Sequence, residues 1–350
     1  MTTMTALVTG GSGFLGGLLI RRLIGEGIKC VSVDLKGPKN ECNDSHATFV
    51  VGDATDQGLL FGLASRYKFD VIFHLASQID FAVKNQKTLF DNNIGCAKAV
   101  AETAKQYKIP KVIFTSSNSV YVGNRLKRPI SELDTPAPVD EYGRSKVQSE
   151  ILLAGYSDFF DYISIRCPNV IDAGRIGMLS ILFEFIEEGR KCWVIGKGEI
   201  RHQCIFAQDL NTALLQCIHY PKSNVFNIGS DNVPTFAEMY RAVIEHAHSR
   251  SKVVSVPGNT AIMLLRLAHR MHLSPMGEYQ FRMLTSDFVF DTAKIKTELS
   301  WKPTLTNSEM LSKAYDYYIE NKEKIYDGER NSANSGAVNM GILKLLKHLS

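Results

Sequence analysis

Short runs of apolar and β-branched residues alternate along the chain with longer stretches whose apolar positions recur at helical spacing. The short runs predict buried strands, and the longer stretches, such as 14–24 and 93–107, predict the helices between them. Strands that are apolar almost throughout and alternate with helices are typical of a parallel sheet covered on both faces. We therefore expect an α/β fold with a doubly wound parallel sheet. The predicted strands are TALVTG (5–10), CVSVD (30–34), TFVVGD (48–53), VIFHLAS (71–77), KVIFTSS (111–117) and YISIRCPNV (162–170).

The pattern loosens beyond Val170, which indicates a second, smaller unit. Helices are predicted at 179–189 and 235–248, strands at 192–196 and 225–230, and a connection at 201–210. We expect residues 1–170 to form a cofactor-binding domain to which a segment of about 200–230 returns. Residues 171–328 would form mainly a C-terminal substrate-binding lobe. Residues 329–350 would be a flexible linker, rich in Asn, Ser, Gly and Ala, and a short amphipathic tail.

Composition narrows the class of protein. A chain of 350 residues with 45% hydrophobic and 22% charged residues is typical of a soluble globular protein. The net charge of +4 and the lack of a basic cluster with interleaved aromatic residues argue against nucleic acid. No apolar run reaches the about 20 residues that a membrane-spanning helix needs, although the tail GILKLLKHLS would bind a membrane surface weakly. Seven cysteines without a CxxC pair argue against disulfides and a metal site, and for a reducing, cytoplasmic compartment.

A glycine-rich turn follows the first predicted strand. In TGGSGFLGG the residues Gly10, Gly13 and Gly16 are spaced three apart, directly before an amphipathic helix. Glycine permits a tight turn and close approach of the backbone to a pyrophosphate, which the helix N-terminus then binds. Asp34 ends the second strand about 20 residues later, where a carboxylate would accept hydrogen bonds from an adenosine ribose. This Rossmann-type arrangement predicts NAD rather than NADP, with Lys36 and a solvated role for Asp34 as the opposing arguments.

A serine, a tyrosine and a lysine are predicted to share the same rim of the sheet. Ser116 and Ser117 end the fifth strand, and Tyr142 and Lys146 lie one turn apart on the next helix. Oxidising a carbinol needs a base that removes the hydroxyl proton. A lysine cation and a positive nicotinamide ring favour the phenolate and would lower the pKa of the tyrosine. A YxxxK pair taken alone is common by chance, but here it accompanies the dinucleotide-binding loop.

These motifs resemble the extended short-chain dehydrogenase/reductase family, in particular its NAD-dependent epimerase/dehydratase branch acting on nucleotide sugars. The resemblance covers about residues 5–325 and rests on TGGSGFLG, GDATD, HLAS, FTSSNSVY, YGRSK, IRCPNV, GKGEIRHQCIFAQDL, NIGSD and DTAKIKTELSWKP. It implies a homodimer, a small-molecule substrate and a catalytic triad of Ser117, Tyr142 and Lys146. The implied substrate-binding residues are Ser117, Asn118, Asn169 and Arg201. The implied NAD-binding residues are Gly10, Gly13, Phe14, Leu15, Gly16, Asp34, Asp53, Ala54, Leu75, Ala76, Ser77, Asn93, Ser116, Tyr142, Lys146 and Pro168.

The chain departs from the family pattern at two places, and two alternative functions stay open. Ser117 is followed by Asn118 and Ser119 where dehydratases carry an acidic pair, so dehydration is disfavoured. The usual aromatic-glycine pair after the substrate-side strand is replaced by IDAG (171–174), so the substrate pocket is expected to differ. A 3β-hydroxysteroid or sterol oxidoreductase is an alternative, suggested in part by the apolar stretch 261–275. A non-catalytic NAD-binding protein is the other.

Overall fold

The centre of the protein is a seven-stranded sheet in which every strand pair is parallel. The computed structural model describes residues 4–38, 46–79, 86–124, 126–258, 263 and 278–326. The chain first builds the sheet in one direction from the central β1, then crosses back to β4 and builds in the other. This reversal opens a crevice at the carboxyl ends of β1 and β4. The strand order is β10 (Asn224–Asn227), β6 (Asp161–Cys167), β5 (Lys111–Ser117), β4 (Val71–His74), β1 (Thr5–Thr9), β2 (Lys29–Asp34) and β3 (Ala47–Val51).

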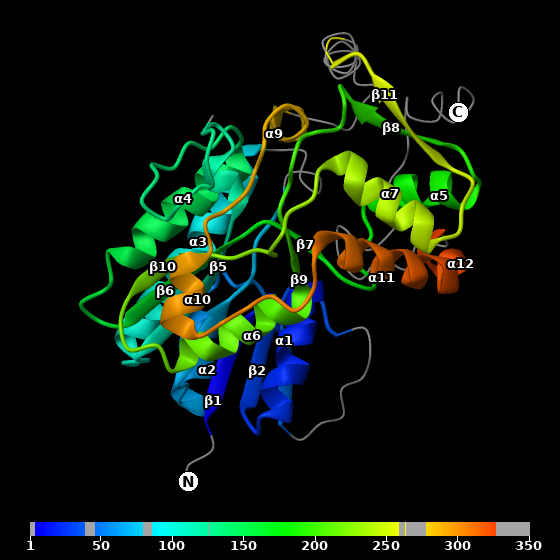
Figure 1. Ribbon diagram of the computed structural model, residues 1–350. Helices are drawn as coiled ribbons and strands as arrows, with labels where there is room; N and C mark the ends of the chain where they lie inside the picture. The colour runs from blue at the N-terminus through cyan, green and yellow to red at the C-terminus, as the bar shows by residue number, and fades with distance from the viewer. Residues whose placement is uncertain are drawn as a thin grey trace.

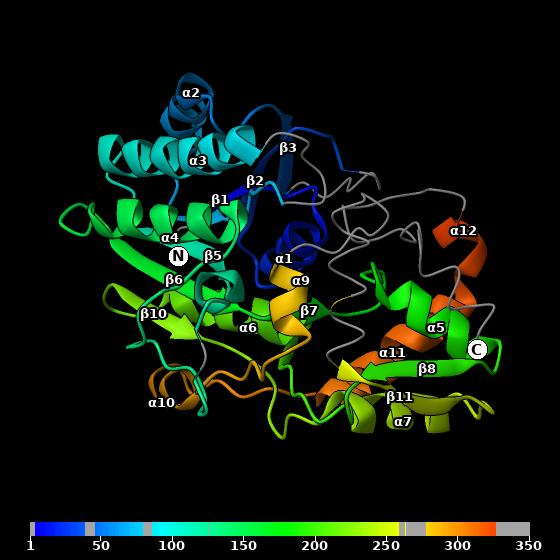
Figure 2. The same cartoon turned by 90° about the horizontal axis from the view of Figure 1, so that it is seen from above.

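Helices cover both faces of the sheet, which confirms the predicted doubly wound α/β fold. One face carries α2 (Gln57–Tyr67), α3 (Gln86–Gln106) and α4 (Glu141–Ala154), and the other carries α1 (Phe14–Gly25), α6 (Ala207–Ile218) and α10 (Ala293–Leu299) (Figure 2). Each layer has its own apolar core, with Leu60 and Val100 buried on the first face and Leu19 and Leu214 on the second. The two faces of the sheet are thus shielded from water. The carboxyl ends of its strands form the rim at which a ligand can enter.

A smaller lobe stands beside the sheet (Figure 1). It has a separate core, in which Phe183, Val243, Leu311 and Tyr318 are fully buried. The parallel pair of β7 (Asn169–Ile171) and β9 (Cys204–Phe206) follows β6 and precedes α6, so the chain enters and leaves the lobe there. The lobe contains α5 (Leu179–Glu187), β8 (Lys191–Ile195), α7 (Phe236–His246), β11 (Lys252–Val256), α11 (Asn307–Glu320) and α12 (Lys322–Tyr326).

The structure differs from the predicted elements in a few places. The helix expected at 93–107 begins already at Gln86. The expected connection 201–210 contains β9 and the start of α6. β11 was not predicted. It follows α7 in the chain and pairs in parallel with β8. The predicted linker and tail at 329–350 lie outside the described residues, and so does nearly all of the apolar stretch 261–275.

The described residues hold neither a helix that could span a membrane nor a metal cluster. None of their helices is long and apolar enough to cross a bilayer. Nor do three or more of their His, Cys, Asp or Glu side chains come together as metal ligands would. Six cysteines fall within the described part of the chain, and all six are buried free thiols. These cysteines therefore act in packing rather than in cross-links.

Candidate active site

The glycine loop after β1 has a geometry that larger side chains would break. Gly10 has a φ of +77°, and a Cβ atom there would lie 2.7 Å from the backbone nitrogen of Ala76. A Cβ atom on Gly16 would lie 2.2 Å from the carbonyl oxygen of Gly10. Gly13 precedes α1 without a side-chain cap, and the first turn of α1 holds no acidic residue. The N–H groups of this helix end are therefore available to the phosphates of a dinucleotide.

Asp34 lies beside the glycine loop at the end of β2, as the NAD-binding pattern requires. Its carboxylate accepts hydrogen bonds from the backbone N–H groups of Ser12, at 3.0 Å, and of Lys36, at 3.3 Å. Asp53 is exposed after β3 and accepts from the N–H of Thr55 at 2.8 Å. Both carboxylates thus stand at the carboxyl ends of strands, where open α/β sheets bind their ligands.

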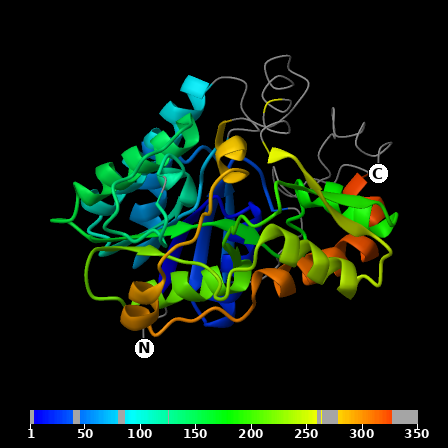
Figure 3. The same cartoon turned by 45° about the horizontal axis from the view of Figure 1, so that its top comes forward.

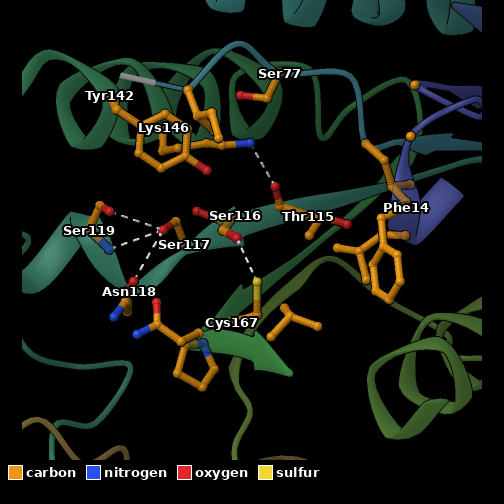
Figure 4. Close-up of a pocket in the computed structure, with 18 of the residues that line it drawn as sticks. Phe14, Ser77, Thr115, Ser116, Ser117, Asn118, Ser119, Tyr142, Lys146 and Cys167 are labelled. Carbon is orange, nitrogen blue, oxygen red and sulfur yellow. Dashed lines mark hydrogen bonds between the residues drawn. The ribbon is translucent and has the colours of Figure 1, made fainter. Parts of the chain in front are cut away.

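A cavity of about 300 Å³ opens next to this loop (Figure 4). It is bounded by the glycine loop, by the ends of β4, β5 and β6, by α4, and by α9 (Glu278–Met283), which lies between the sheet and the lobe (Figure 3). The structure brings most of the predicted site residues together here. Those that line the cavity are Gly10, Gly13, Phe14, Leu15, Gly16, Leu75, Ser77, Ser116, Ser117, Asn118, Tyr142, Lys146, Pro168 and Asn169.

Six predicted residues do not line this cavity: Asp34, Asp53, Ala54, Ala76, Asn93 and Arg201. Asn93 is buried and works one layer behind it. Its amide nitrogen donates to the carbonyl of Gln78, at 3.1 Å, and to the hydroxyl of Ser145, at 2.9 Å, while its oxygen accepts from the Gln78 N–H. Ser145 in turn donates to the carbonyl oxygen of Tyr142 at 2.7 Å. Asn93 therefore ties the loop after β4 to the helix that carries Tyr142 and Lys146.

Arg201 is placed differently from what the resemblance implies. Its side chain is exposed and does not reach the cavity, and its backbone nitrogen donates to Asp287 at 2.9 Å. Arg166, which precedes Asn169 in the same motif, is also not free for a ligand. Its guanidinium is buried against the carboxylate of Glu150, at 2.5 Å, and the hydroxyl of Tyr121. Neither arginine lines the cavity among the described residues.

The predicted triad converges at one end of the cavity. Figure 4 shows Tyr142 and Lys146 reaching from α4 toward the serines at the end of β5. The Lys146 amine donates to the carbonyl of Thr115 at 2.9 Å and lies 5.7 Å from the centre of the Tyr142 ring. The Ser117 hydroxyl lies 3.2 Å from the hydroxyl of Ser119 and accepts from the N–H of that residue at 3.1 Å. The arrangement places a phenol, an alcohol and an amine around one space.

Burial dominates the protonation of these groups. It raises the pKa of Tyr142, while the Ser117 hydroxyl and the positive charge of Arg175 act in the opposite direction. Burial also lowers the pKa of Lys146 to about 8. The net effect on Tyr142 is therefore opposite to the lowering expected from the sequence. The expected lowering of the Tyr142 pKa assumed a bound nicotinamide ring with a positive charge. That charge would add to the charge of Lys146.

Several lining residues escaped the sequence analysis. Cys167 ends β6, Arg175 follows β7, and Tyr279 comes from α9, where its hydroxyl donates to Asn118 at 3.3 Å. Asp140 lines the cavity too, although its carboxylate accepts from the Gly143 N–H at 2.7 Å and so caps α4. No local pattern announces Tyr279, which lies 161 residues from Asn118 in the chain. The remaining unpredicted lining residues are Ile79, Thr115, Ser119 and Val170.

Comparison with known proteins identifies the family. The model of the NAD-dependent epimerase/dehydratase family matches residues 6–229. The chain belongs to this family. Its members are enzymes, and NAD is the cofactor, which agrees with the open helix end and glycine loop described above.

Full-length relatives extend the match beyond the family model. The chain is 30% identical over 98% of its length to the uncharacterized protein y4nG of Sinorhizobium fredii, of which 86% is covered. It is 26% identical over 90% of its length to a UDP-glucose 4-epimerase of Mycolicibacterium smegmatis, of which 98% is covered. The chain therefore spans nearly the whole of both relatives.

Solved structures agree with the fold. A Thermotoga maritima UDP-glucose 4-epimerase with UDP-glucose superimposes with a TM-score of 0.76 at 24% identity, covering 91% of this chain and 100% of that one. The Bordetella bronchiseptica enzyme WbmG in complex with NAD gives a TM-score of 0.74 at 20% identity and covers 91% and 95%. At identities below 25% the likeness concerns the fold alone. In both cases it extends over 91% of this chain.

Proposed function

We propose that the protein transfers a hydride between NAD and a hydroxyl-bearing carbon of a nucleotide sugar. As an epimerase it would oxidise the hydroxyl to a ketone and return the hydride to the opposite face, and as a reductase it would transfer a hydride from NADH to a ketone. The observation that carries this proposal is the convergence of Ser117, Tyr142 and Lys146 in a cavity that begins at the glycine loop. Bound NAD supplies the hydride acceptor and donor. The names of the relatives, several of them UDP-glucose 4-epimerases, support a nucleotide sugar as the substrate.

Each member of the triad has a separate task. The hydroxyl of Tyr142 removes the proton from the sugar hydroxyl and returns it after hydride transfer. The Ser117 hydroxyl orients the reacting oxygen by a hydrogen bond. Lys146 carries a positive charge near the phenol, which stabilises its ionised form, and its bond to the Thr115 carbonyl fixes the amine.

The lining of the cavity supports a sugar over a sterol. Hydroxyl and amide groups of Ser117, Asn118, Ser119 and Tyr279 surround the space next to Tyr142. Ser117, Ser119 and Tyr279 hydrogen-bond one another or the amide oxygen of Asn118, but the buried amide nitrogen of Asn118 has no partner among the described residues. A sugar hydroxyl would supply that partner, and the apolar rings of a sterol would not. Dehydration stays disfavoured, because the carboxylate of Asp140 is already engaged in capping α4. The cytoplasmic location stays a prediction from the cysteine pattern, and the homodimer stays a prediction of the family resemblance.

The test is to incubate the protein with UDP-, GDP- and dTDP-sugars, with and without added NAD, and to analyse the sugars and the nicotinamide absorbance. A new stereoisomer without net NADH indicates epimerisation, and stoichiometric NADH or NAD indicates a dehydrogenase or reductase. Turnover of 3β-hydroxysteroids with no reaction of any nucleotide sugar would overturn the proposal. NAD binding without turnover of either class would favour the non-catalytic alternative.

A further inference from the structure

Arg175 is a second cationic side chain that lines the cavity, besides Lys146. It follows β7 through a short turn, in which its backbone N–H donates to the carbonyl of Asp172 at 3.1 Å and Gly174 has a φ of +84°. The central carbon of the guanidinium lies 5.8 Å from the centre of the Phe14 ring, the residue that begins α1. The turn therefore presents a positive charge to the cavity from the substrate-lobe side of the chain.

Nothing within the described parts of the chain neutralises this charge. No hydrogen bond or ion pair of the described residues reaches the guanidinium of Arg175, and burial lowers its pKa. The groups that act against this lowering are the Cys167 thiol and the Tyr142 hydroxyl, which are neutral near pH 7. Arg166 shows the alternative: its buried guanidinium is paired with the carboxylate of Glu150. Arg175 is half-buried where it lines the cavity, so an anionic ligand would find a cation there that no carboxylate of the described residues already neutralises.

We propose that Arg175 binds an anionic oxygen group of the substrate, either its diphosphate or a carboxylate on its sugar. The inference rests on the proposed function and names the residue that selects charged substrates. Two observations favour the substrate as the source of the anion. The loop that carries Arg175 follows Asn169, which also lines the cavity, and Arg201, the arginine that the family pattern suggests for a diphosphate, lies exposed outside it. A planar guanidinium matches phosphate and carboxylate oxygens in a bidentate manner.

The experiment measures ligand binding by calorimetry to the NAD-loaded protein, so that it does not depend on turnover. The probes are UDP, UDP-glucose and UDP-glucuronic acid, and the proteins are the natural chain, Arg175→Met, Arg175→Lys and Arg201→Met. We expect Arg175→Met to weaken binding at least tenfold and Arg175→Lys to restore part of the loss. Equal weakening of all three probes identifies the diphosphate as the bound group, and a loss confined to UDP-glucuronic acid identifies the carboxylate.

Three results would overturn the proposal, and they are separate from a failure of the proposed function. The first is that Arg175→Met binds every probe with the affinity of the natural chain. The second is that Arg201→Met, rather than Arg175→Met, loses affinity for the probes. A loss of NAD affinity in Arg175→Met with unchanged probe binding would make the residue a cofactor ligand. By contrast, a natural chain that binds NAD but none of the nucleotide probes, and turns over no nucleotide sugar, would contradict the proposed function itself.

Discussion

Replacing Gly16 by alanine tests whether the glycine loop is shaped for NAD. The added Cβ atom would lie 2.2 Å from the carbonyl oxygen of Gly10 and 2.6 Å from the Cα atom of Gly11. Both are backbone atoms, so the loop itself must move. Overpacking of this kind costs about 1–3 kcal/mol. If that cost falls on the NAD-binding conformation, affinity decreases about 5- to 150-fold, since about 1.4 kcal/mol is tenfold.

Gly17→Ala is the matched control in the same helix. Its Cβ atom would meet its nearest neighbour, the carbonyl oxygen of Gly11, at 3.7 Å, which is an ordinary contact. Alanine also stabilises a helix interior by about 0.5–1 kcal/mol relative to glycine. Calorimetric titration with NAD gives the affinity, and thermal unfolding shows whether each variant is folded. Equal NAD affinity of folded Gly16→Ala and Gly17→Ala would refute the argument.

Three further outcomes follow from other parts of the structure. Glu150→Gln leaves the charge of the buried Arg166 uncompensated and is expected to lower the free energy of unfolding in urea by about 3–5 kcal/mol. Glu26→Gln, which removes an exposed ion pair with Arg22, is the control, and an equally small loss for both variants would contradict this. Lys146, whose pKa burial lowers to about 8, loses its charge above that pH, so kcat/KM should decline there. Lys146→Arg should move the decline of kcat/KM to higher pH, because arginine keeps its charge there. An unchanged pH profile would contradict a role for the charge of Lys146. Thr235→Ala removes both the side-chain cap and the capping box of α7 and should cost about 0.5–2 kcal/mol in thermal unfolding, unlike a neutral surface change.

The sheet and the meeting of Ser117, Tyr142 and Lys146 at one cavity were predictable because their signals are local. The apolar strands, the glycine turn and the Tyr142–Lys146 spacing each need only a few neighbouring residues to be recognised. Parallel topology then brings the carboxyl ends of the strands to one edge, so Ser117 and the glycine loop meet without further information.

The other side of the cavity was not predictable in this way. Tyr279 reaches Asn118 from a helix far along the chain, and only the packing of that helix against Val120 and its neighbours brings the two together. Arg175 has a weak signal, a basic residue directly after the turn that follows the substrate-side strand. The spacing of Arg201 resembled the family pattern, but spacing does not tell whether a side chain faces the cavity or the solvent. The pKa of Tyr142 also depends on burial, which a pattern of residue types does not measure.

The central claim is that the hydroxyl of Tyr142 moves the proton of the sugar hydroxyl beside bound NAD. The most direct measurement compares the natural chain with Tyr142→Phe, each loaded with NAD and mixed with the substrate found in the nucleotide-sugar screen. A general acid-base group contributes about 10²- to 10⁴-fold, so single-turnover product formation should slow by at least about 100-fold while NAD affinity stays unchanged. Product formation by Tyr142→Phe at the rate of the natural chain would contradict the account.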